Sequence, residues 1–339
     1  MTRRGILTGG TWCVDRNLLL DRWPNANGRA NILSSEIGVG GSGSNLAFAV
    51  RSLDPDMPVA TIALVGDDAD GRFLIDAAEA KGIDHSHMML TSEAATDYTL
   101  AFTSGPTGQR THISCFGAGN WLTPDHFDFS GFDHRLLHLG IPGVHARMDM
   151  PWHGDENGWV TTLKKARAVR LQCNLELASI DPQRINALMR PCLPYLDLLI
   201  VNDAEIGGIA GIETVRSGAA VPQACLAAAR TVLEQGAMRF VVVHFPAGAV
   251  VACRDGTTSV RPSVRVPPDE VKGANGAGDA FAAGFLYAIH QDWPVDDAVA
   301  LAHATAAASL RSISTVGAIG GWAECLQLAD RWGWRESVE

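Results

Sequence analysis

The chain has 339 residues, enough for one large α/β domain or two ordinary ones with an ample core. Its 27 Lys and Arg residues against 37 Asp and Glu give a formal net charge of −10, which argues against nucleic acid or an anionic membrane as the main partner. The seven Cys show no C-x-x-C spacing, so we expect reduced thiols. We find neither a signal-peptide apolar region nor a run of about 18 apolar residues, so we expect a cytoplasmic protein.

Short apolar runs alternate with helical stretches along the chain, which predicts a largely parallel sheet covered by helices. The predicted strands are 5–10, 59–66, 136–141, 171–177, 198–202 and 240–245. The predicted helices are 44–53, 71–82, 160–168, 183–190, 221–236, 279–290 and 296–310. Asp255-Gly256, between two apolar arms, predicts a β-hairpin. We therefore expect a single α/β domain over residues 1–339.

Two stretches interrupt the alternation of strands and helices. Residues 13–37 are mixed and extended, and residues 96–116 form two alternating arms around Gly105-Pro106-Thr107-Gly108, which predicts a hairpin. Both stretches can belong to one small β-sheet inserted in the α/β core as a lid. The alternative is that they are ordinary surface loops and a solvent-facing hairpin.

The run Gly273-Ala274-Asn275-Gly276-Ala277-Gly278-Asp279 immediately precedes a predicted helix. A turn of small residues that opens a helix directs backbone N–H groups and the positive end of the helix dipole at one spot, which favours an anion. Asp279 lies in the first turn, where its carboxylate can accept a proton. An anion site beside a proton acceptor suits phosphoryl transfer to a hydroxyl, so the run predicts a kinase. The alternative is a glycine-rich helix cap without a ligand.

This run resembles the D-T-x-G-A-G-D signature of the ribokinase-like (PfkB) family of sugar and nucleoside kinases, and its last four residues match. The resemblance implies a doubly wound, mostly parallel sheet flanked by helices, with a small β-sheet lid. It also implies that Asp279 is the catalytic base. Gly276, Ala277 and Gly278 would then supply the backbone amides of the anion hole for the transferred phosphate.

The second glycine cluster, 38–43, contains G-x-G-x-x-G, the fingerprint of NAD-dependent oxidoreductases. That fingerprint needs a strand leading straight into the glycines, and the preceding ANILSSEI is too polar. The same residues resemble the PfkB substrate motif, which implies that Gly40, Gly41 and Asn45 bind sugar hydroxyls together with Asp15. Taken alone, Asp15 is a turn or cap residue and Asn45 caps the start of its own helix.

Further segments are similar to family motifs in the same order along the chain. Residues 65–71 resemble V-G-x-D-x-x-G, and Asn202-Asp203-Ala204-Glu205 resembles N-x-x-E, a motif that organises Mg²⁺ and phosphate near the nucleotide. Since Mg²⁺ keeps much of its water, the resemblance implies that Glu205 and Asn202 act partly through water. Taken alone, these residues are the end of a strand followed by a helix cap.

The chain also departs from the family pattern on the nucleotide side. The segment 243–248 is one residue shorter than the family loop; it contains His244 and Pro246 and retains Gly248. Gly273 and Ala274 replace Asp and Thr, which removes the strongest oxygen ligand of a monovalent cation site, so we do not expect potassium dependence. His303 occupies the region that lines the family's adenine pocket. His244 and His303 are therefore candidate nucleotide contacts, although a lone His beside a strand is also a common packed residue.

Together these features predict an ATP-dependent and Mg²⁺-dependent kinase that phosphorylates a hydroxyl of a small sugar or sugar-like substrate. A nucleoside kinase of the same fold is the alternative, and it needs an apolar or aromatic lid, for which Tyr98, Phe102, Trp12 and Trp23 are candidates. A ligand-sensing protein with little catalysis is a further alternative, motivated by the altered nucleotide loop. Lids of this family often form dimer contacts, which implies a homodimer.

Overall fold

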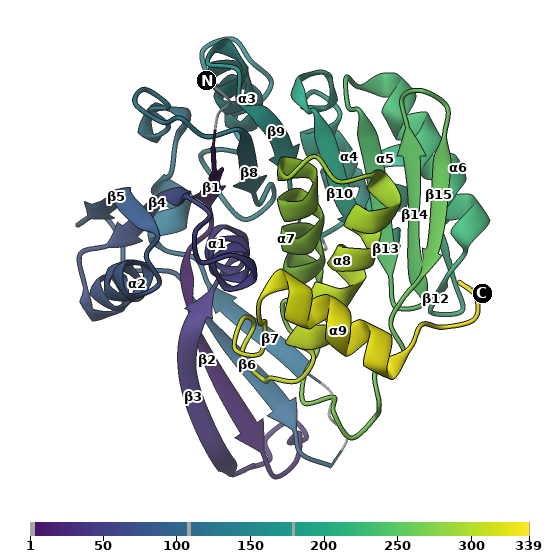
Figure 1. The fold of residues 1–339 in the computed structure, drawn as a ribbon. Coiled ribbons are helices and arrows are strands. Elements are labelled where there is room, and N and C mark those ends of the chain that lie inside the picture. Colours follow the sequence, from purple (N-terminus) through teal and green to yellow (C-terminus); the bar gives the residue numbers. More distant parts are fainter. Residues whose placement is uncertain (1–3, 107–109, 178–179, 339) are drawn as a thin grey trace.

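The computed structural model describes residues 4–106, 110–177 and 180–338, and nine strands of these residues form one large sheet (Figure 1). In spatial order the strands are β15 (Thr258–Pro262), β14 (Gly248–Cys253), β13 (Phe240–Phe245), β10 (Leu198–Asn202), β9 (Gln172–Leu175), β8 (Leu136–Gly140), β1 (Ile6–Gly10), β4 (Val59–Gly66) and β5 (Asp84–Thr91). The pairings from β13 to β5 are parallel, whereas β14 pairs antiparallel with β13 and β15. The largely parallel sheet is therefore confirmed.

Helices cover both faces of this sheet, and each face has its own apolar cluster. One face carries α1 (Ser42–Leu53), α2 (Ala69–Ala80), α7 (Ala277–His290), α8 (Val295–Ser309) and α9 (Trp322–Trp332). The other carries α3 (Gly158–Ala168), α4 (Pro182–Met189), α5 (Asp203–Ala210) and α6 (Pro222–Gln235). Among the residues described, no helix combines the length and apolarity needed to cross a membrane.

Smaller elements complete the α/β part. Short 3₁₀ helices occupy Ala118–Trp121, Pro124–His126 and Leu193–Tyr195, and β11 (Val215–Arg216) pairs with β12 (Ala219–Ala220). The sequence patterns did not predict β5, α5 or α9. β5 is an edge strand whose first four residues are all polar, and α5 is a short helix that contains two glycines. Both therefore lack the long apolar periodicity that identifies a buried element.

A separate four-stranded sheet, ordered β3 (Ile32–Gly40), β2 (Cys13–Leu20), β6 (Tyr98–Ser104) and β7 (Arg110–Cys115), extends downward from the large sheet in Figure 1. β2 pairs antiparallel with β3 and parallel with β6, and β6 pairs antiparallel with β7. The small additional sheet is therefore confirmed. Residues 107–109 of the predicted hairpin turn lie outside the described part of the chain.

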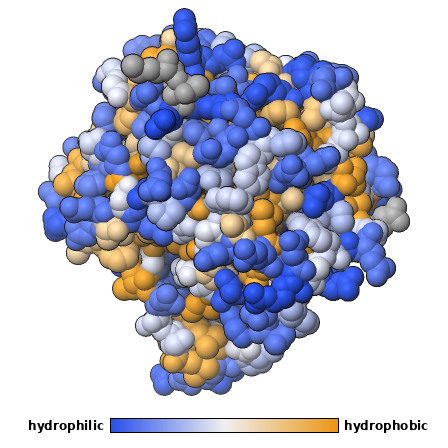
Figure 2. Space-filling view, viewed as in Figure 1, coloured by the Kyte–Doolittle hydropathy of each residue, from blue (hydrophilic) through white to orange (hydrophobic). Residues whose placement is uncertain are grey.

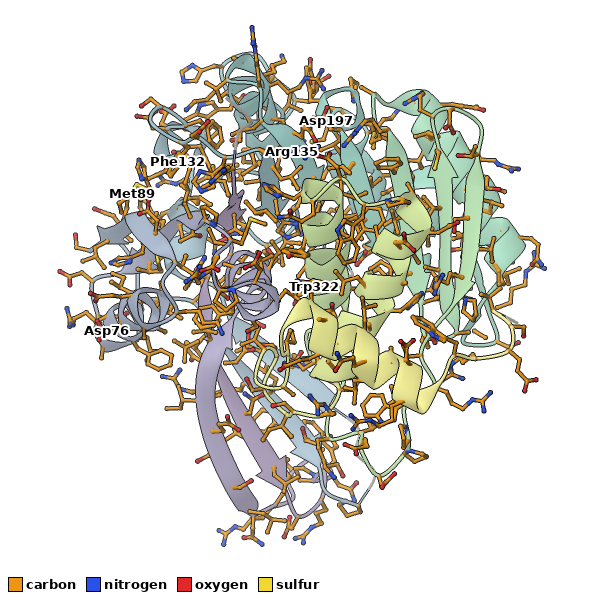
Figure 3. The ribbon with its side chains drawn as sticks, in the orientation of Figure 1. Asp76, Met89, Phe132, Arg135, Asp197 and Trp322 are labelled. Atoms are coloured by element: carbon orange, nitrogen blue, oxygen red, sulfur yellow. The ribbon has the colours of Figure 1, made fainter. Side chains whose placement is uncertain are left out.

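The strand order reverses between β1 and β8, because β4 and β5 extend the sheet on one side of β1 and the later parallel strands extend it on the other. Ligands of doubly wound sheets bind beyond the carboxyl ends of the strands at such a point. Arg135 and Asp197, which directly precede β8 and β10, lie near the top of Figure 3, away from the small sheet. The carboxyl ends therefore face the small sheet, and a site is expected between the two.

Close packing of α7 against α8 depends on Gly284. A Cβ at this position would lie 2.7 Å from Thr305 Oγ1 and 2.9 Å from Ala302 Cα. We expect Gly284→Ala to lower the free energy of unfolding, measured by chemical denaturation, by about 1–3 kcal/mol because the two helices must move apart. Gly208→Ala in α5 is the matched control, since its Cβ would meet no atom closer than 3.4 Å. An equal loss of stability in both variants would contradict this account.

Candidate active site

The first turn of α7 lies between two cavities at the carboxyl edge of the large sheet. The larger cavity, of about 510 Å³, is lined by Ala277, Gly278 and Phe281 of this helix. The smaller cavity, of about 280 Å³, is lined by Asp279 and by Asn275 of the preceding turn. The helix start therefore presents small residues to one cavity and a carboxyl group to the other.

Backbone geometry at Gly276 explains how α7 begins. Gly276 has φ of 71°, in the left-handed region that glycine adopts without strain, and a Cβ there would lie 2.8 Å from Thr315 Cβ. The first amides of a helix have no intrahelical acceptor, and the dipole adds positive potential at the same place. The predicted anion-hole residues Gly276, Ala277 and Gly278 thus form one continuous helix start beside Asp279.

The Asp279 side chain is held by a network from other parts of the chain. Asn45 Nδ2 donates a hydrogen bond of 2.8 Å to Asp279 Oδ2, and Thr315 Oγ1 donates one of 2.8 Å to Asn45 Oδ1. The second bond holds the Asn45 amide from the side opposite Asp279. Burial of the carboxyl group raises the pKa of Asp279 well above its usual range, and the neighbouring Glu176 carboxyl adds to the increase. Such a group is suited to accept a proton near neutral pH.

Asp15, Gly41 and Asn45 line the smaller cavity together with Asp279. Burial raises the pKa of Asp15 to about 7 against a hydrogen bond from Cys13, and the charge of Asp279 adds to the increase. Gly40 leaves room for the Asp15 side chain, since a Cβ on Gly40 would lie 2.3 Å from the Asp15 carboxyl carbon. The predicted substrate-binding residues therefore converge on the side of α7 that carries Asp279.

Two histidines that both contact the Phe281 ring line the larger cavity. The ring centroids of His244 and His303 lie 4.9 Å and 5.0 Å from that of Phe281. Burial lowers the pKa of His244 to about 4 and that of His303 to about 3, so both rings are neutral at physiological pH. Among the residues described, His303 Nε2 is buried without a hydrogen-bond partner. The cavity thus has three flat, uncharged rings in its wall.

Asn202 and Glu205 form a capping box at the start of α5. Glu205 Oε2 accepts a hydrogen bond of 2.9 Å from Asn202 N, and Asn202 Oδ1 accepts one of 2.8 Å from Glu205 N. Asn202 lines the larger cavity, whereas Glu205 and Gly248 do not contribute to its lining in the described part of the chain. Gly248 begins β14 opposite Phe245, where a Cβ would lie 2.5 Å from Arg261 O.

Sequence reasoning missed the polar residues behind Asp279. Glu176 follows β9 and lines the smaller cavity, while His138 and Asn174 lie on β8 and β9 beneath it. The available signal was the three polar side chains at alternate positions of the otherwise apolar segment 171–177, those of Gln172, Asn174 and Glu176. Polar groups at the carboxyl end of a parallel strand face the ligand site of a doubly wound fold.

The two cavities, separated by a helix N-terminus and a buried carboxyl group, suit a phosphotransferase on a doubly wound α/β fold. The chain matches the family described as pfkB family carbohydrate kinase over residues 13–319. The protein therefore belongs to the pfkB carbohydrate kinases. Membership, predicted above from the motifs, is confirmed. The expectation that no strand leads into residues 38–43 is wrong, since β3 ends at Gly40, but this strand belongs to the small sheet and the dinucleotide interpretation fails for that reason.

Known proteins of this kind cover most of the chain. An adenosine kinase of Schizosaccharomyces pombe is 25% identical over 276 residues, which are 78% of this chain and 77% of that protein. A fructokinase of Klebsiella pneumoniae is 26% identical over 317 residues, 87% and 89% of the two chains. The solved structure of Arabidopsis thaliana ribokinase complexed with ribose and ATP has a TM-score of 0.74 at 17% identity and covers 96% and 98%. The protein is accordingly an ATP-dependent sugar or nucleoside kinase.

Substitution of Gly40 tests whether the Asp15 carboxyl group needs the room that this glycine leaves. We expect Gly40→Ala to reduce kcat/KM for the preferred substrate at least tenfold, because the added methyl group displaces the Asp15 carboxyl. Gly38→Ala on the same strand is the matched control, since a Cβ there meets nothing within 4 Å. Steady-state kinetics and melting temperatures of both variants check the prediction. Similar kinetics for the two variants would argue against a substrate role of Asp15.

Proposed function

We propose that the protein transfers the γ-phosphoryl group of ATP to a hydroxyl of a small, uncharged sugar, with Asp279 as the general base. The position of the first turn of α7 between the two cavities is the observation that carries this proposal. The substrate O–H bond breaks, its proton passes to Asp279, and the oxygen bonds to the γ-phosphorus as ADP leaves. The amides of residues 276–278 stabilise the charge on the transferred group.

Charge in the smaller cavity favours an uncharged substrate. Four carboxyl groups line it, those of Asp15, Asp97, Glu176 and Asp279, and its described lining contains neither Lys nor Arg. A phosphosugar or sugar acid would bring a further negative charge without a cationic partner. Neutral hydroxyl groups instead suit carboxylates, each of which can accept hydrogen bonds from two adjacent hydroxyls.

The lid favours a sugar over a nucleoside. Of the four aromatic candidates, Trp12 is buried, and its Nε1 donates a hydrogen bond to Thr61 Oγ1. Trp23 packs against Phe102, with 5.9 Å between the ring centroids. Tyr98 lines the cavity, but the Arg16 guanidinium lies 5.2 Å from its ring centroid. Phe116 also lines the cavity, and for that reason a nucleoside remains the second candidate. A base would need a fuller aromatic clamp than these residues provide.

The nucleotide side supports catalysis over ligand sensing alone. Pro246 lies in the tight turn between β13 and β14, yet it lines a cavity of about 510 Å³. The hydrogen bonds from Asn45 to Asp279 and from Thr315 to Asn45 also hold the Asp279 carboxyl group in place. The altered loop therefore leaves space for a nucleotide, and we propose that His244 and His303 contact its base.

We propose that Mg²⁺ acts with ATP and that its oxygen ligands come largely from the phosphates. No group of three or more His, Cys, Asp or Glu suited to a metal exists in the described part of the chain. Asn202 lines the cavity, and Glu205 would act through water. We propose no potassium site, since Gly273 and Ala274 offer no carboxylate. The seven Cys are all free, which suits a reducing compartment, and we propose a cytoplasmic location.

We further propose a homodimer in which a second copy covers one face of the small sheet. Cross-strand register places Ile37, Leu100 and Ile113 in one row across this sheet together with Arg16, which forms an ion pair with Asp70. Leu18 and Phe102 lie in the next row on the same face. Ile37 is 60% exposed and Ile113 is 53% exposed. Figure 2 shows hydrophobic surface on the lower lobe that the small sheet forms. Two such faces can bury each other's apolar surface.

A screen of ADP release tests the proposed reaction. We expect release above background with at least one neutral sugar in the presence of ATP and Mg²⁺, and none with phosphosugars or sugar acids. Asp279→Asn should reduce kcat by about 10²–10⁴-fold, because a general base contributes on that order. Chelation of Mg²⁺ should abolish the release. Turnover of a nucleoside but of no sugar would overturn the sugar assignment, and wild-type turnover by Asp279→Asn would overturn the mechanism.

Light scattering coupled to size-exclusion chromatography tests the dimer. The wild type should elute with twice the mass of the 339-residue chain, and Ile37→Asp with Ile113→Asp should shift it to the monomer mass, because buried charges disfavour the interface. Val260→Asp on β15 is the control, since Val260 is 51% exposed on the large sheet. A monomeric wild type would refute this interface.

A further inference from the structure

A row of polar side chains extends inward from Asp279 across the carboxyl ends of β9 and β8. Glu176, whose side chain is 19% exposed, shares a hydrogen bond with the Asp279 carboxyl group. Glu176 Oε2 lies 2.6 Å from Nε2 of the fully buried His138. The His138 Nδ1 in turn lies 3.0 Å from Asn174 Nδ2. None of these three residues has a role in the mechanism described so far.

One backbone contact fixes the direction of both hydrogen bonds of His138. Ile200 N donates to Asn174 Oδ1 at 3.2 Å, so the Asn174 NH₂ group faces His138 and donates to its Nδ1. The single proton of the neutral imidazole then lies on Nε2 and is donated to Glu176. Burial lowers the pKa of His138 to about 4, which keeps the ring neutral. His138 can therefore orient Glu176 but cannot take up its proton.

We propose that Asp279 and Glu176 work as one carboxyl pair that shares a single proton, and that His138 and Asn174 hold Glu176 in place for this purpose. This inference rests on Asp279 being the general base. Of the two described hydrogen-bond partners of Asp279, Asn45 and Glu176, only Glu176 is ionisable. Glu176 is thus a positioning residue of the reaction.

The physical reason is repulsion between like charges in an enclosed site. Two adjacent carboxyl groups share a proton because both cannot ionise at low cost. Burial raises the pKa of Glu176 to about 7 against the hydrogen bond with Asp279, and the charge of Glu205 on α5 adds to the increase. Asp15 on β2 also faces the pair, and the charge of Asp279 contributes to its own raised pKa. One retained proton therefore lowers the negative charge beside the incoming γ-phosphoryl group.

The shared proton also sets the state from which catalysis starts. In the empty site the shared proton rests on Asp279, because the hydrogen bond between the two groups raises the pKa of Asp279 and lowers that of Glu176. When this proton passes to Glu176, the Asp279 carboxylate can accept the proton of the substrate hydroxyl. After transfer both carboxyl groups are protonated, and one proton returns to solvent when the products leave. No further reactant is needed, and the pair passes from one bound proton to two.

The full-length Glu176→Gln variant, assayed with ATP, Mg²⁺ and the sugar that gives the highest turnover, tests the pair. Gln can accept from His138 and donate to Asp279, so it imitates the protonated Glu176 without its charge. We expect kcat to fall less than tenfold and the alkaline limb of the kcat/KM profile, where the wild-type pair loses its shared proton, to move to higher pH by about one unit or more, because Gln at this position cannot ionise. An alkaline limb at the wild-type pH overturns the inference.

Two variants of His138 test the positioning role independently, in case Glu176→Gln does not fold. His138→Leu should lower kcat at least tenfold with little change in KM, because Glu176 loses the donor that orients it. His138→Gln, whose amide can donate to Glu176, should recover most of that loss. Equal kinetics for the two variants, or a change in KM alone, overturns the inference.

The Asp279→Asn variant separates failure of the proposed function from failure of the carboxyl pair. If Asp279→Asn keeps wild-type turnover, the proposed function itself fails. If Asp279→Asn is inactive while Glu176→Gln keeps the wild-type pH profile, only the carboxyl pair fails.

Discussion

The structure depends on a carboxyl group held at the positive end of a helix between two cavities. Asp279 is fixed there by Asn45 of α1, which is itself fixed by Thr315 beyond α8. Its other described partner is Glu176 beyond β9, which is oriented from β8 by His138. Placing a carboxylate in such an enclosed position is costly unless it is hydrogen-bonded, so the network has to bring together segments more than 200 residues apart in the chain.

The sheet topology explains why these segments meet. Because the strand order reverses between β1 and β8, the loops beyond these two strands diverge and leave space at the carboxyl edge. The small sheet enters that space from β1 and supplies Asp15, while α7 supplies the helix start. Two glycines make the fit possible, since Gly40 leaves room for the Asp15 carboxyl group and Gly276 allows the chain to turn into α7.

The sequence predicted the α/β alternation and the main motifs because both are local patterns. Runs such as 59–66 are continuous and apolar, and glycine clusters mark turns wherever the chain folds. The sequence did not predict which way the side chains of the small sheet point, because a shift of one residue in the strand register moves a side chain to the other face of the strand. Trp12 illustrates this limit, since it was a candidate for the lid but lies in the core. Glu176 and His138 were missed because only the tertiary fold places them behind Asp279.

The N-x-x-E segment shows why a motif and a structural cap need not be alternatives. Asn202 and Glu205 satisfy each other's backbone amides as a capping box, which accounts for their spacing without any ligand. The same cap places Asn202 at the larger cavity and the Glu205 charge close enough to raise the pKa of Glu176. A cation that neutralised Glu205 would therefore also ease ionisation of the carboxyl pair. On this argument, binding of ATP with Mg²⁺ changes the proton affinity of the proposed base. The cation lowers the proton affinity of Asp279, and the negative charge of the phosphates raises it. The balance between the cation and the phosphates therefore sets how readily Asp279 accepts the substrate proton.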